Sequence, residues 1–359
     1  MSLKLEKILF LINTPYQLMV AINLAESTYK RCMNDIIISD RLAGYEELSE
    51  RIKKEDIFNE VYVIKLSKIC PQFDKTIALK NLIINPFGIL KEKYNAFLFA
   101  NLNYDVSCIY RRLKKVNQNI KIYMFEDGLA SYSAYYNNML KKYQAKTGKL
   151  LKRPIHFILN NAFRHIDGLF VFEPSFMTYT TSFPVIKMKN INGKNKNLVN
   201  LYNRVFDYNV EVDSYDKKVI FFEESYYADG YDVNDIEEVE KIASIVGKEN
   251  IFIKIHPRNP QNRFDELGYT TNKNISIPWE VICMNMDLKD KILVTIASVA
   301  VIEPATMLSK EYNGILLMKM ISDDTCLKKD ITSLYEKICQ KYTYIHLVES
   351  ISELEECLN

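Results

Sequence analysis

The chain has 359 residues, which is too many for one typical hydrophobic core and predicts two domains. Hydrophobic residues make up 48% and charged residues 26%, as in a soluble globular protein, and the formal net charge of +2 gives no argument for nucleic-acid binding. Seven scattered cysteines form no CxxC pair or His-Cys cluster, so neither a zinc site nor a disulfide framework is expected, and a reducing cytoplasm fits. No apolar run approaches the roughly 20 residues of a membrane span or resembles a secretory signal.

The first half of the chain alternates between predicted strands and helices. Runs rich in β-branched and aromatic residues predict strands at 7–12, 35–39, 61–66, 96–100, 120–125 and 169–172. Apolar residues at helical spacing predict helices at 16–29, 45–54, 106–116 and 133–144.

A second series of the same kind follows. Strands are predicted at 219–223, 251–255, 291–296, 315–318 and 344–348, and helices at 233–246, 300–308, 327–340 and 351–357. Two such series predict two α/β domains with parallel sheets. Polar Asn- and Lys-rich residues thin the core pattern between Lys187 and Lys217, so we place an N-terminal domain at 1–190 and a C-terminal domain at 191–359.

The stretch Lys254-Ile255-His256-Pro257-Arg258 closes a strand of the second series. Pro257 cannot donate to a β-ladder, so the strand stops there and leaves His256 at its carboxyl end, where open α/β sheets bind ligands. A histidine can protonate a leaving group near neutral pH, and the flanking cations favour a phosphate. A histidine that only caps a turn explains this motif, taken alone, equally well.

The stretch Asn13-Thr14-Pro15-Tyr16-Gln17 directly follows the first predicted strand. Pro15 suits the first helical position and Thr14 or Asn13 suits the N-cap, so this helix N-terminus is suited to bind an anion or a sugar hydroxyl. A well-capped helix without a ligand is the simpler interpretation. The chain contains neither GxGxxG nor GxxxxGK[ST], which argues against a dinucleotide cofactor and against ATP or GTP hydrolysis.

Two acid–glycine pairs are candidates for a general base. In Glu126-Asp127-Gly128 the aspartate follows a predicted strand, and the glycine permits a turn that exposes the acid. Asp229-Gly230 follows a strand of the second series in the same way. Either aspartate can take a proton from an attacking hydroxyl, although Asp-Gly is also among the commonest turn pairs.

A third strand end carries Ser298, shortly before Glu303-Pro304. A hydroxyl at a strand end, followed by the start of a helix, can bind phosphate. Glu303 can accept hydrogen bonds from a ribose. Each of these signals is weak when it is considered alone.

Together, the first loop, the Glu126-Asp127-Gly128 acid followed by Tyr132, the His256 strand end and Ser298 resemble the bacterial sialyltransferases. The closest resemblance is to glycosyltransferase family 52, which includes lipooligosaccharide sialyltransferases and capsule-forming relatives, and it spans Asn13 to about Ser298. It implies a GT-B fold, in which two Rossmann-like domains with parallel sheets face a central cleft. The N-terminal domain would take the acceptor and the C-terminal domain the CMP-linked donor.

The resemblance also implies the reaction. N-acetylneuraminic acid would pass from CMP-N-acetylneuraminic acid to a terminal galactose of a bacterial surface glycan, with inversion and without a metal or other cofactor. His256, as an imidazolium, would stabilise the leaving phosphate of an oxocarbenium-like transition state. Asp127 or Asp229 would be the base, with a slight preference for Asp127. The substrate-binding residues would be Asn13, Thr14, Pro15, Tyr16, Gln17, Lys254, Pro257, Arg258, Ser298 and Glu303.

Several alternatives stay open. The same two-domain pattern suits another GT-B glycosyltransferase, or a non-catalytic nucleotide-sugar-binding protein of polysaccharide assembly. The acceptor, the linkage and the oligomeric state, a homodimer included, are not specified by the residues.

Residues 141–165 interleave cations with apolar residues and lack acids, which favours peripheral contact with an anionic membrane at its cytoplasmic face. A basic surface hairpin is the alternative, and Gly148 and Pro154 favour it.

Overall fold

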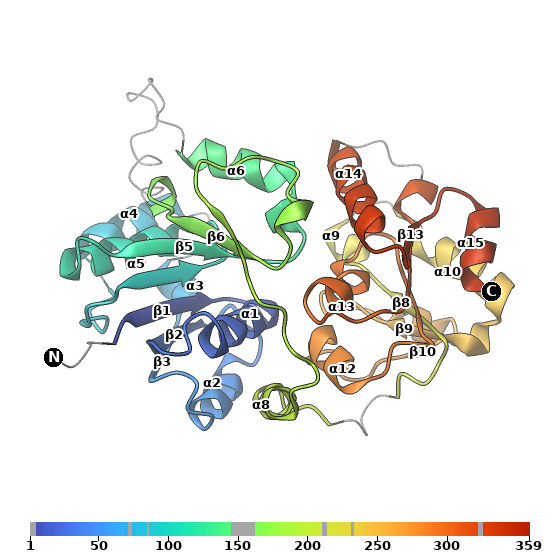
Figure 1. The fold of residues 1–359 in the computed structure, drawn as a ribbon, viewed down its shortest axis with the longest axis horizontal. Helices are drawn as coiled ribbons and strands as arrows, with labels where there is room; N and C mark the ends of the chain where they lie inside the picture. Colours follow the sequence, from blue (N-terminus) through green and yellow to red (C-terminus); the bar gives the residue numbers. More distant parts are fainter. Residues whose placement is uncertain are drawn as a thin grey trace. The chain divides into compact units, whose positions relative to one another are not determined.

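The computed structural model describes residues 5–70, 74–84, 86–144, 162–209, 214–230, 233–321 and 326–359. The chain divides into two compact units, unit 1 from Met1 to Lys189 and unit 2 from Asn190 to Asn359. Each unit contains one parallel β-sheet with helices beside it (Figure 1). The predicted α/β architecture with two parallel sheets is therefore confirmed.

The sheet of unit 1 has the strand order β3-β2-β1-β4-β5-β6-β7. Its strands are β1 (Lys7–Ile12), β2 (Met33–Ser39), β3 (Glu60–Ile64), β4 (Ala96–Phe99), β5 (Lys121–Phe125), β6 (Gly168–Val171) and β7 (Val185–Lys187). Its helices are α1 (Pro15–Glu26), α2 (Tyr45–Lys53), α3 (Leu66–Ile69), α4 (Lys75–Ile84), α5 (Tyr104–Val116) and α6 (Ala134–Gln144). The direction of winding reverses between β1 and β4, and this reversal is the place where doubly wound sheets bind ligands.

The central strand β1 is apolar after Lys7, as expected where helices cover both faces of a doubly wound parallel sheet. In β1 every residue from Ile8 to Ile12 is buried. Its register against β2 pairs Lys7 with Met33 and Ile12 with Ile38. The apolar run that the sequence analysis identified is therefore a central strand, and Asn13 follows it at the carboxyl edge.

The sheet of unit 2 has the order β10-β9-β8-β11-β12-β13, which reverses between β8 and β11 in the same way. Its strands are β8 (Val219–Phe222), β9 (Ile251–Lys254), β10 (Thr270–Thr271), β11 (Ile292–Thr295), β12 (Asn313–Leu316) and β13 (Ile345–Leu347). Its helices are α8 (Lys196–Phe206), α9 (Tyr226–Asp229), α10 (Asp235–Val246), α11 (Arg263–Glu266), α12 (Trp279–Asn285), α13 (Glu303–Thr306), α14 (Cys326–Lys341) and α15 (Ile351–Leu358). Figure 1 shows α10 and α15 on one side of this sheet and α12 and α13 on the other.

Within the polar stretch between Lys187 and Lys217, the structure has a helix, α8, that the sequence did not predict. Asn195 caps this helix by accepting hydrogen bonds from the N–H groups of Asn197 and Leu198. The polar residues lie on one side of α8, while Tyr202, Val205 and other apolar residues on the opposite side are buried. A helix whose apolar residues form a narrow stripe is polar in its average composition. The composition of this segment therefore did not indicate a helix.

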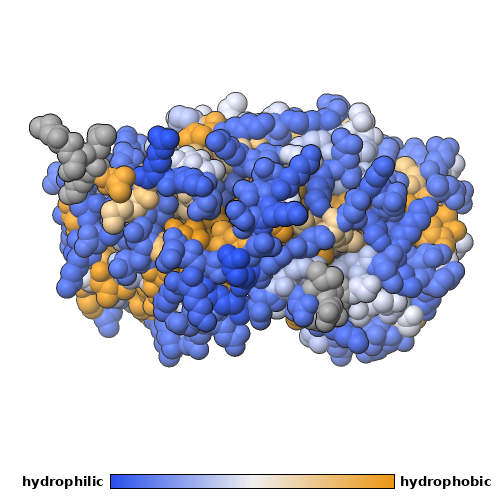
Figure 2. Space-filling view, turned by 60° about the horizontal axis from the view of Figure 1, so that its bottom comes forward, coloured by the Kyte–Doolittle hydropathy of each residue, from blue (hydrophilic) through white to orange (hydrophobic). Residues whose placement is uncertain are grey.

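The surface combines charged residues with small apolar groups. On the face shown in Figure 2, hydrophilic residues cover most of the surface and hydrophobic residues form separate groups. Ile83 and Ile84 of α4 are among the exposed apolar residues, at 72% and 61%. Within the described residues, no helix combines the length and apolarity needed to cross a membrane. Most of the predicted membrane-binding stretch, residues 145–161, lies outside the described residues.

Candidate functional site

The carboxyl ends of β1, β2, β4 and β5 lie at one edge of the unit 1 sheet because these strands are parallel neighbours. The loop after β1 leads into α1 as the sequence predicted. Thr14 is the N-cap, its Oγ1 accepts the N–H of Gln17 at 3.2 Å, and Pro15 occupies the first turn. The cap orients α1 and holds the Gln17 side chain, which is fully buried, beneath this edge.

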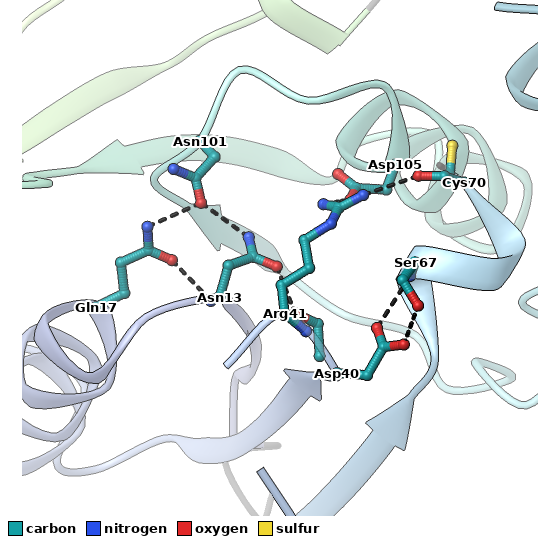
Figure 3. A network of polar contacts seen from close by, with 9 residues as sticks. Asn13, Gln17, Asp40, Arg41, Ser67, Cys70, Asn101 and Asp105 are labelled. Atoms are coloured by element: carbon teal, nitrogen blue, oxygen red, sulfur yellow. Dashed lines mark hydrogen bonds and ion pairs between the residues drawn. The ribbon is translucent and has the colours of Figure 1, made fainter. Parts of the chain in front are cut away.

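A chain of side-chain amides connects these strand ends (Figure 3). Gln17 Oε1 accepts the backbone N–H of Asn13 at 2.8 Å, and Gln17 Nε2 donates to Asn101 Oδ1 at 2.8 Å. Asn13 Nδ2 donates to the same Asn101 oxygen at 2.8 Å, while Ser39 Oγ donates to Asn13 Oδ1 at 2.6 Å. Asn101 Nδ2 in turn donates to Asp127 Oδ2 at 2.9 Å. The amide chain, defined as Asn13, Gln17 and Asn101, therefore ends on the predicted base.

Arg41 lies next to the amide chain in Figure 3, but its guanidinium is directed elsewhere. It forms an ion pair with the buried Asp105 and donates to the backbone oxygen of Cys70 at 2.8 Å. Burial raises the pKa of Asp105, and the Arg41 charge acts in the opposite direction. Because Asp105 compensates the Arg41 charge, this pair orders the loop after β2.

Asp127 lies in the turn after β5. Its backbone N–H donates to Ser131 Oγ at 2.8 Å, and Gly128 has a φ of 65°, which favours glycine. Burial raises the pKa of Asp127, while hydrogen bonds from Gln17 and Asn101 lower it. The carboxyl group is therefore held by neutral donors, and an acid with a raised pKa is a better proton acceptor when it is ionised.

The neighbouring Glu126 has a different role. Its Oε1 accepts the hydroxyl of Tyr16 at 2.8 Å, and its Oε2 accepts the N–H of Phe172 at 2.8 Å and the hydroxyl of Tyr132. Burial raises the pKa of Glu126 to about 7, although these hydrogen bonds oppose the shift. Glu126 thereby links α1, β5 and the segment that follows β6.

His256 lies just beyond the carboxyl end of β9 in unit 2. Its backbone N–H donates to Glu223 Oε2 at 2.9 Å, and its ring Nδ1 accepts the backbone N–H of Arg258 at 3.2 Å. Burial, together with the charges of Arg258 and Lys254, lowers the pKa of His256 to about 4. At neutral pH the ring by itself is therefore neutral and carries its proton on Nε2. The imidazolium expected from the sequence requires an anion beside the ring.

Arg258 brings the second predicted base into the same cluster. Its Nη1 lies 3.0 Å from Asp229 Oδ1, and its Nη2 donates to Ser225 Oγ at 2.6 Å. Ser225 Oγ also donates to Asp229 Oδ2 at 2.6 Å. Asp229 is therefore paired with a cation.

A buried ion network supports the His256 loop. Arg263 Nη2 lies 2.8 Å from Glu223 Oε1 and 2.7 Å from Asp235 Oδ2, and its Nη1 lies 3.1 Å from Asp235 Oδ1. Its guanidinium also lies 4.6 Å from the ring centre of Tyr227. Glu223 accepts the backbone N–H of His256 through its other oxygen. Arg263 therefore fixes the carboxylate to which the His256 loop is hydrogen bonded.

At the reversal between β8 and β11, Glu224 connects the two strand ends. Its Oε1 accepts the hydroxyl of Thr295 at 3.1 Å and the backbone N–H of Ala297. Ser298 follows, with its N–H donating to Thr295 Oγ1 at 3.1 Å and its Oγ accepting the N–H of Ala300 at 3.3 Å. Burial raises the pKa of Glu224 to about 7. Because Ser298 Oγ acts as an acceptor in its bond to Ala300, its hydroxyl proton can still be donated to a ligand.

The other predicted residues of unit 2 occupy the same edge of the sheet. Lys254 is the last residue of β9 and is 8% exposed, while Pro257 is exposed. Glu303 begins α13 and is buried. The predicted residues therefore form two clusters, one in each unit: Asn13, Thr14, Pro15, Tyr16, Gln17 and Asp127 in unit 1, and Asp229, Lys254, His256, Pro257, Arg258, Ser298 and Glu303 in unit 2.

Two residues of these clusters were not predicted from the sequence: Asn101 and Arg263. Asn101 lies two residues after the end of β4, close to the kind of strand-end position that identified Asn13. Arg263 begins the short helix α11 and carries no local signal. Among the described residues, no group of three or more His, Cys, Asp or Glu side chains is arranged to hold a metal ion.

Solved structures similar to this chain identify its fold. The UDP-GlcNAc 2-epimerase from Methanocaldococcus jannaschii has a TM-score of 0.54 and 15% identity, and the alignment covers 98% of this chain and 91% of that one. LpCGTa in complex with UDP has a TM-score of 0.52 and 10% identity, covering 99% and 90%. The spinosyn forosaminyltransferase SpnP has a TM-score of 0.51 and 9% identity, covering 99% and 100%. These similarities confirm the predicted GT-B fold.

The family comparison covers most of the chain. A search of curated proteins found no match. Residues 8–310 match the model of the family described as alpha-2,8-polysialyltransferase (POLYST), and this range includes every predicted site residue from Asn13 to Glu303. The match supports the resemblance to bacterial sialyltransferases at the level of the enzyme class. The chain therefore belongs to the alpha-2,8-polysialyltransferase family.

Proposed function

We propose that this protein transfers N-acetylneuraminic acid from CMP-N-acetylneuraminic acid to a glycan of the bacterial surface, with inversion at the anomeric carbon. The family match over residues 8–310 carries this proposal. The cationic strand end around His256 supports it, because a nucleotide donor leaves as a phosphate. The motifs that resemble glycosyltransferase family 52 point to the same donor.

In this proposal unit 2 binds the donor phosphate. The neutral His256 ring offers its Nε2–H, since its Nδ1 already accepts from Arg258. A phosphate beside the ring would offset the cations that lower the His256 pKa, and would favour the imidazolium as negative charge develops. Lys254 ends β9 and Ser298 follows β11, so they add a cation and a hydroxyl at the carboxyl ends of the two strands that flank β8.

The proposed base is Asp127. Among the described residues it is held by the amides of Gln17 and Asn101 and pairs with no cation, whereas Asp229 pairs with Arg258. In the reaction Asp127 takes the proton of the acceptor hydroxyl, and the hydroxyl oxygen bonds to the anomeric carbon. The bond from that carbon to the phosphate oxygen breaks, and its electron pair leaves with CMP. The proposal requires no metal ion.

Two acceptors follow from two observations. The resemblance to family 52 implies a terminal galactose. The description of the matched family names an alpha-2,8-polysialyl product, which implies a terminal sialic acid as the acceptor. Galactose-ended and sialic-acid-ended oligosaccharides distinguish these cases when they are offered separately.

The alternative is a GT-B enzyme or binding protein that uses a UDP-sugar, since the similar epimerase and LpCGTa are named with UDP compounds. Thermal stabilisation by CMP and not by UDP would support the sialyltransferase, and stabilisation by UDP would support this alternative.

The cellular setting is part of our proposal. The enzyme works in the cytoplasm, at the inner face of the membrane where surface glycans are assembled, and acts as a monomer or homodimer.

The first prediction distinguishes the two aspartates. Asp127→Asn and Asp229→Asn both keep the side-chain size and remove the charge. We expect Asp127→Asn to lower sialyl transfer by about 10²–10⁴-fold, the usual contribution of a general base, and to keep CMP affinity. Asp229→Asn should weaken CMP binding, because the Arg258 guanidinium loses the carboxylate that holds it in place for the donor phosphate.

Transfer rates and calorimetric CMP affinities of both variants check this assignment. If Asp229→Asn abolishes transfer while Asp127→Asn remains active, the roles of the two acids are reversed. If both keep the wild-type rate, neither aspartate is the base.

A further inference from the structure

We propose that Asn101 is a positioning residue that orients the Asp127 carboxylate for proton transfer, and that Gln17 and Asn13 fix the orientation of Asn101. This inference rests on the proposed function, in which Asp127 is the base. It assigns a role to a residue that no sequence motif identified. It also assigns Asn13 and Gln17 to support of the base.

The hydrogen bonds of the amide chain determine which side of each amide faces its neighbour. A primary amide has an accepting oxygen and a donating nitrogen, and the two ends are not interchangeable. The backbone N–H of Asn13 can only donate, so the Gln17 atom 2.8 Å away is the oxygen. Gln17 therefore presents its nitrogen to Asn101, whose atom at 2.8 Å is the oxygen.

It follows that the nitrogen of Asn101 faces Asp127, 2.9 Å from Oδ2. A second series of hydrogen bonds is consistent with this orientation. Ser39 Oγ donates to Asn13 Oδ1 at 2.6 Å, and Asn13 Nδ2 donates to Asn101 Oδ1 at 2.8 Å. The Asn101 oxygen thus accepts two hydrogen bonds that its nitrogen cannot accept (Figure 3).

Burial makes this arrangement rigid. Gln17 and Ser39 are fully buried, and Asn13 is 7% exposed. Turning over any amide of the chain would place buried donors against donors, and unsatisfied buried polar groups are strongly unfavourable. Asn101 therefore offers Asp127 one fixed donor.

The chemical consequence is an oriented base without a neighbouring cation. A neutral donor favours the ionised carboxylate modestly, whereas a paired arginine favours it strongly and reduces its basicity. Asn101 and Gln17 lower the Asp127 pKa against the effect of burial. Loss of the Asn101 donor should therefore raise the pKa of Asp127 and loosen its orientation.

The test compares Asn101→Ala with Asn103→Ala in the full-length enzyme. Asn103 lies in the same loop, at the N-cap of α5, and its side chain makes no capping hydrogen bond. We expect Asn101→Ala to move the acidic limb of the kcat/KM profile upward by about one pH unit and to lower kcat at least roughly 10-fold, with unchanged CMP affinity. Asn103→Ala should keep the wild-type profile.

A purely structural role for Asn101 would lower the melting temperature and leave the midpoint of the acidic limb in place. An unchanged midpoint in folded Asn101→Ala therefore overturns the inference. Titration of the Asp127 carboxyl by 13C NMR, assigned with Asp127→Asn, gives the same comparison without substrate. There we expect a raised pKa in the Asn101 variant, and an unchanged pKa overturns the inference.

The variant Asn101→Asp covers the case in which Asn101→Ala does not fold. It keeps the side-chain size and the oxygen that accepts from Gln17 and Asn13, but it can no longer donate a hydrogen bond to an ionised Asp127. We expect a folded protein whose acidic limb lies at higher pH than that of the wild type and whose kcat is lowered by at least about 10-fold. An unchanged midpoint of the acidic limb in this variant would overturn the inference.

Failure of the inference differs from failure of the proposed base. Full activity of Asp127→Asn contradicts the assignment of Asp127. Loss of activity in Asp127→Asn together with an unshifted Asn101→Ala profile contradicts only the role of Asn101.

Discussion

Glu224 shows, at the scale of a single residue, how a buried acid makes stability depend on pH. Burial raises its folded-state pKa to about 7, above the ordinary value of 4.5, so the folded protein binds a proton that the unfolded chain releases. The stabilisation from this proton is fully present below about pH 4.5. It is lost as the pH rises through 7, because the buried carboxylate must then be charged.

Glu224→Gln should remove this dependence. Its amide oxygen can keep the hydrogen bonds from Thr295 and Ala297, and it has no charge to bury. Between pH 5 and pH 8 the wild type should lose about 2 kcal/mol of unfolding free energy relative to this variant. Urea unfolding of both proteins at the two pH values measures the difference. Parallel losses in wild type and variant would mean that Glu224 does not titrate in this range.

At the scale of elements, the ends of β8 and β9 are joined by the ion network around Arg263. The Arg263 side chain is 17% exposed, and its partners Glu223 and Asp235 are 0% and 3% exposed. Removal of one member of such a network leaves the others charged and buried. The network therefore connects the stability of unit 2 to the placement of the His256 loop.

Arg263→Met tests this network. We expect a loss of about 3 kcal/mol of unfolding free energy, because two buried carboxylates lose their cation. Lys53→Met is the matched control, since Lys53 pairs with Glu50 on the exposed surface of α2 and should change stability by less than about 0.5 kcal/mol. Urea unfolding at pH 7 gives both values. A similar small effect of the two substitutions would show that the Arg263 network contributes no net stability.

The sequence predicted elements best where the signal is local. The apolar run of β1, the Thr14 cap and the Asp127-Gly128 turn depend on adjacent residues and were found. The amphipathic helix α8 was missed because its polar face dominates its composition. The Asn101 bonds to Asn13 and Gln17 join residues 88 and 84 positions apart, so only the fold brings them together.

At the scale of the whole molecule, the two units repeat one topology and divide the chemistry. Each sheet reverses its winding next to its first strand, between β1 and β4 in unit 1 and between β8 and β11 in unit 2. Doubly wound sheets place ligands at such reversals. The amide chain that ends on Asp127 lies at the first reversal, and Glu224 with the loop before Ser298 lies at the second. The alternation of strands and helices predicted both sheets, but not which strand ends would meet.

The most direct test of the sialyltransferase proposal is release of CMP from CMP-N-acetylneuraminic acid by the purified full-length protein. The reaction is run with galactose-ended and sialic-acid-ended acceptors and without an acceptor, and a parallel assay offers UDP-N-acetylglucosamine. We predict acceptor-dependent release of CMP, a loss of about 10²–10⁴-fold in His256→Ala, and no turnover of the UDP-sugar. Turnover of the UDP-sugar, with no CMP release in the presence of either acceptor, would contradict the account.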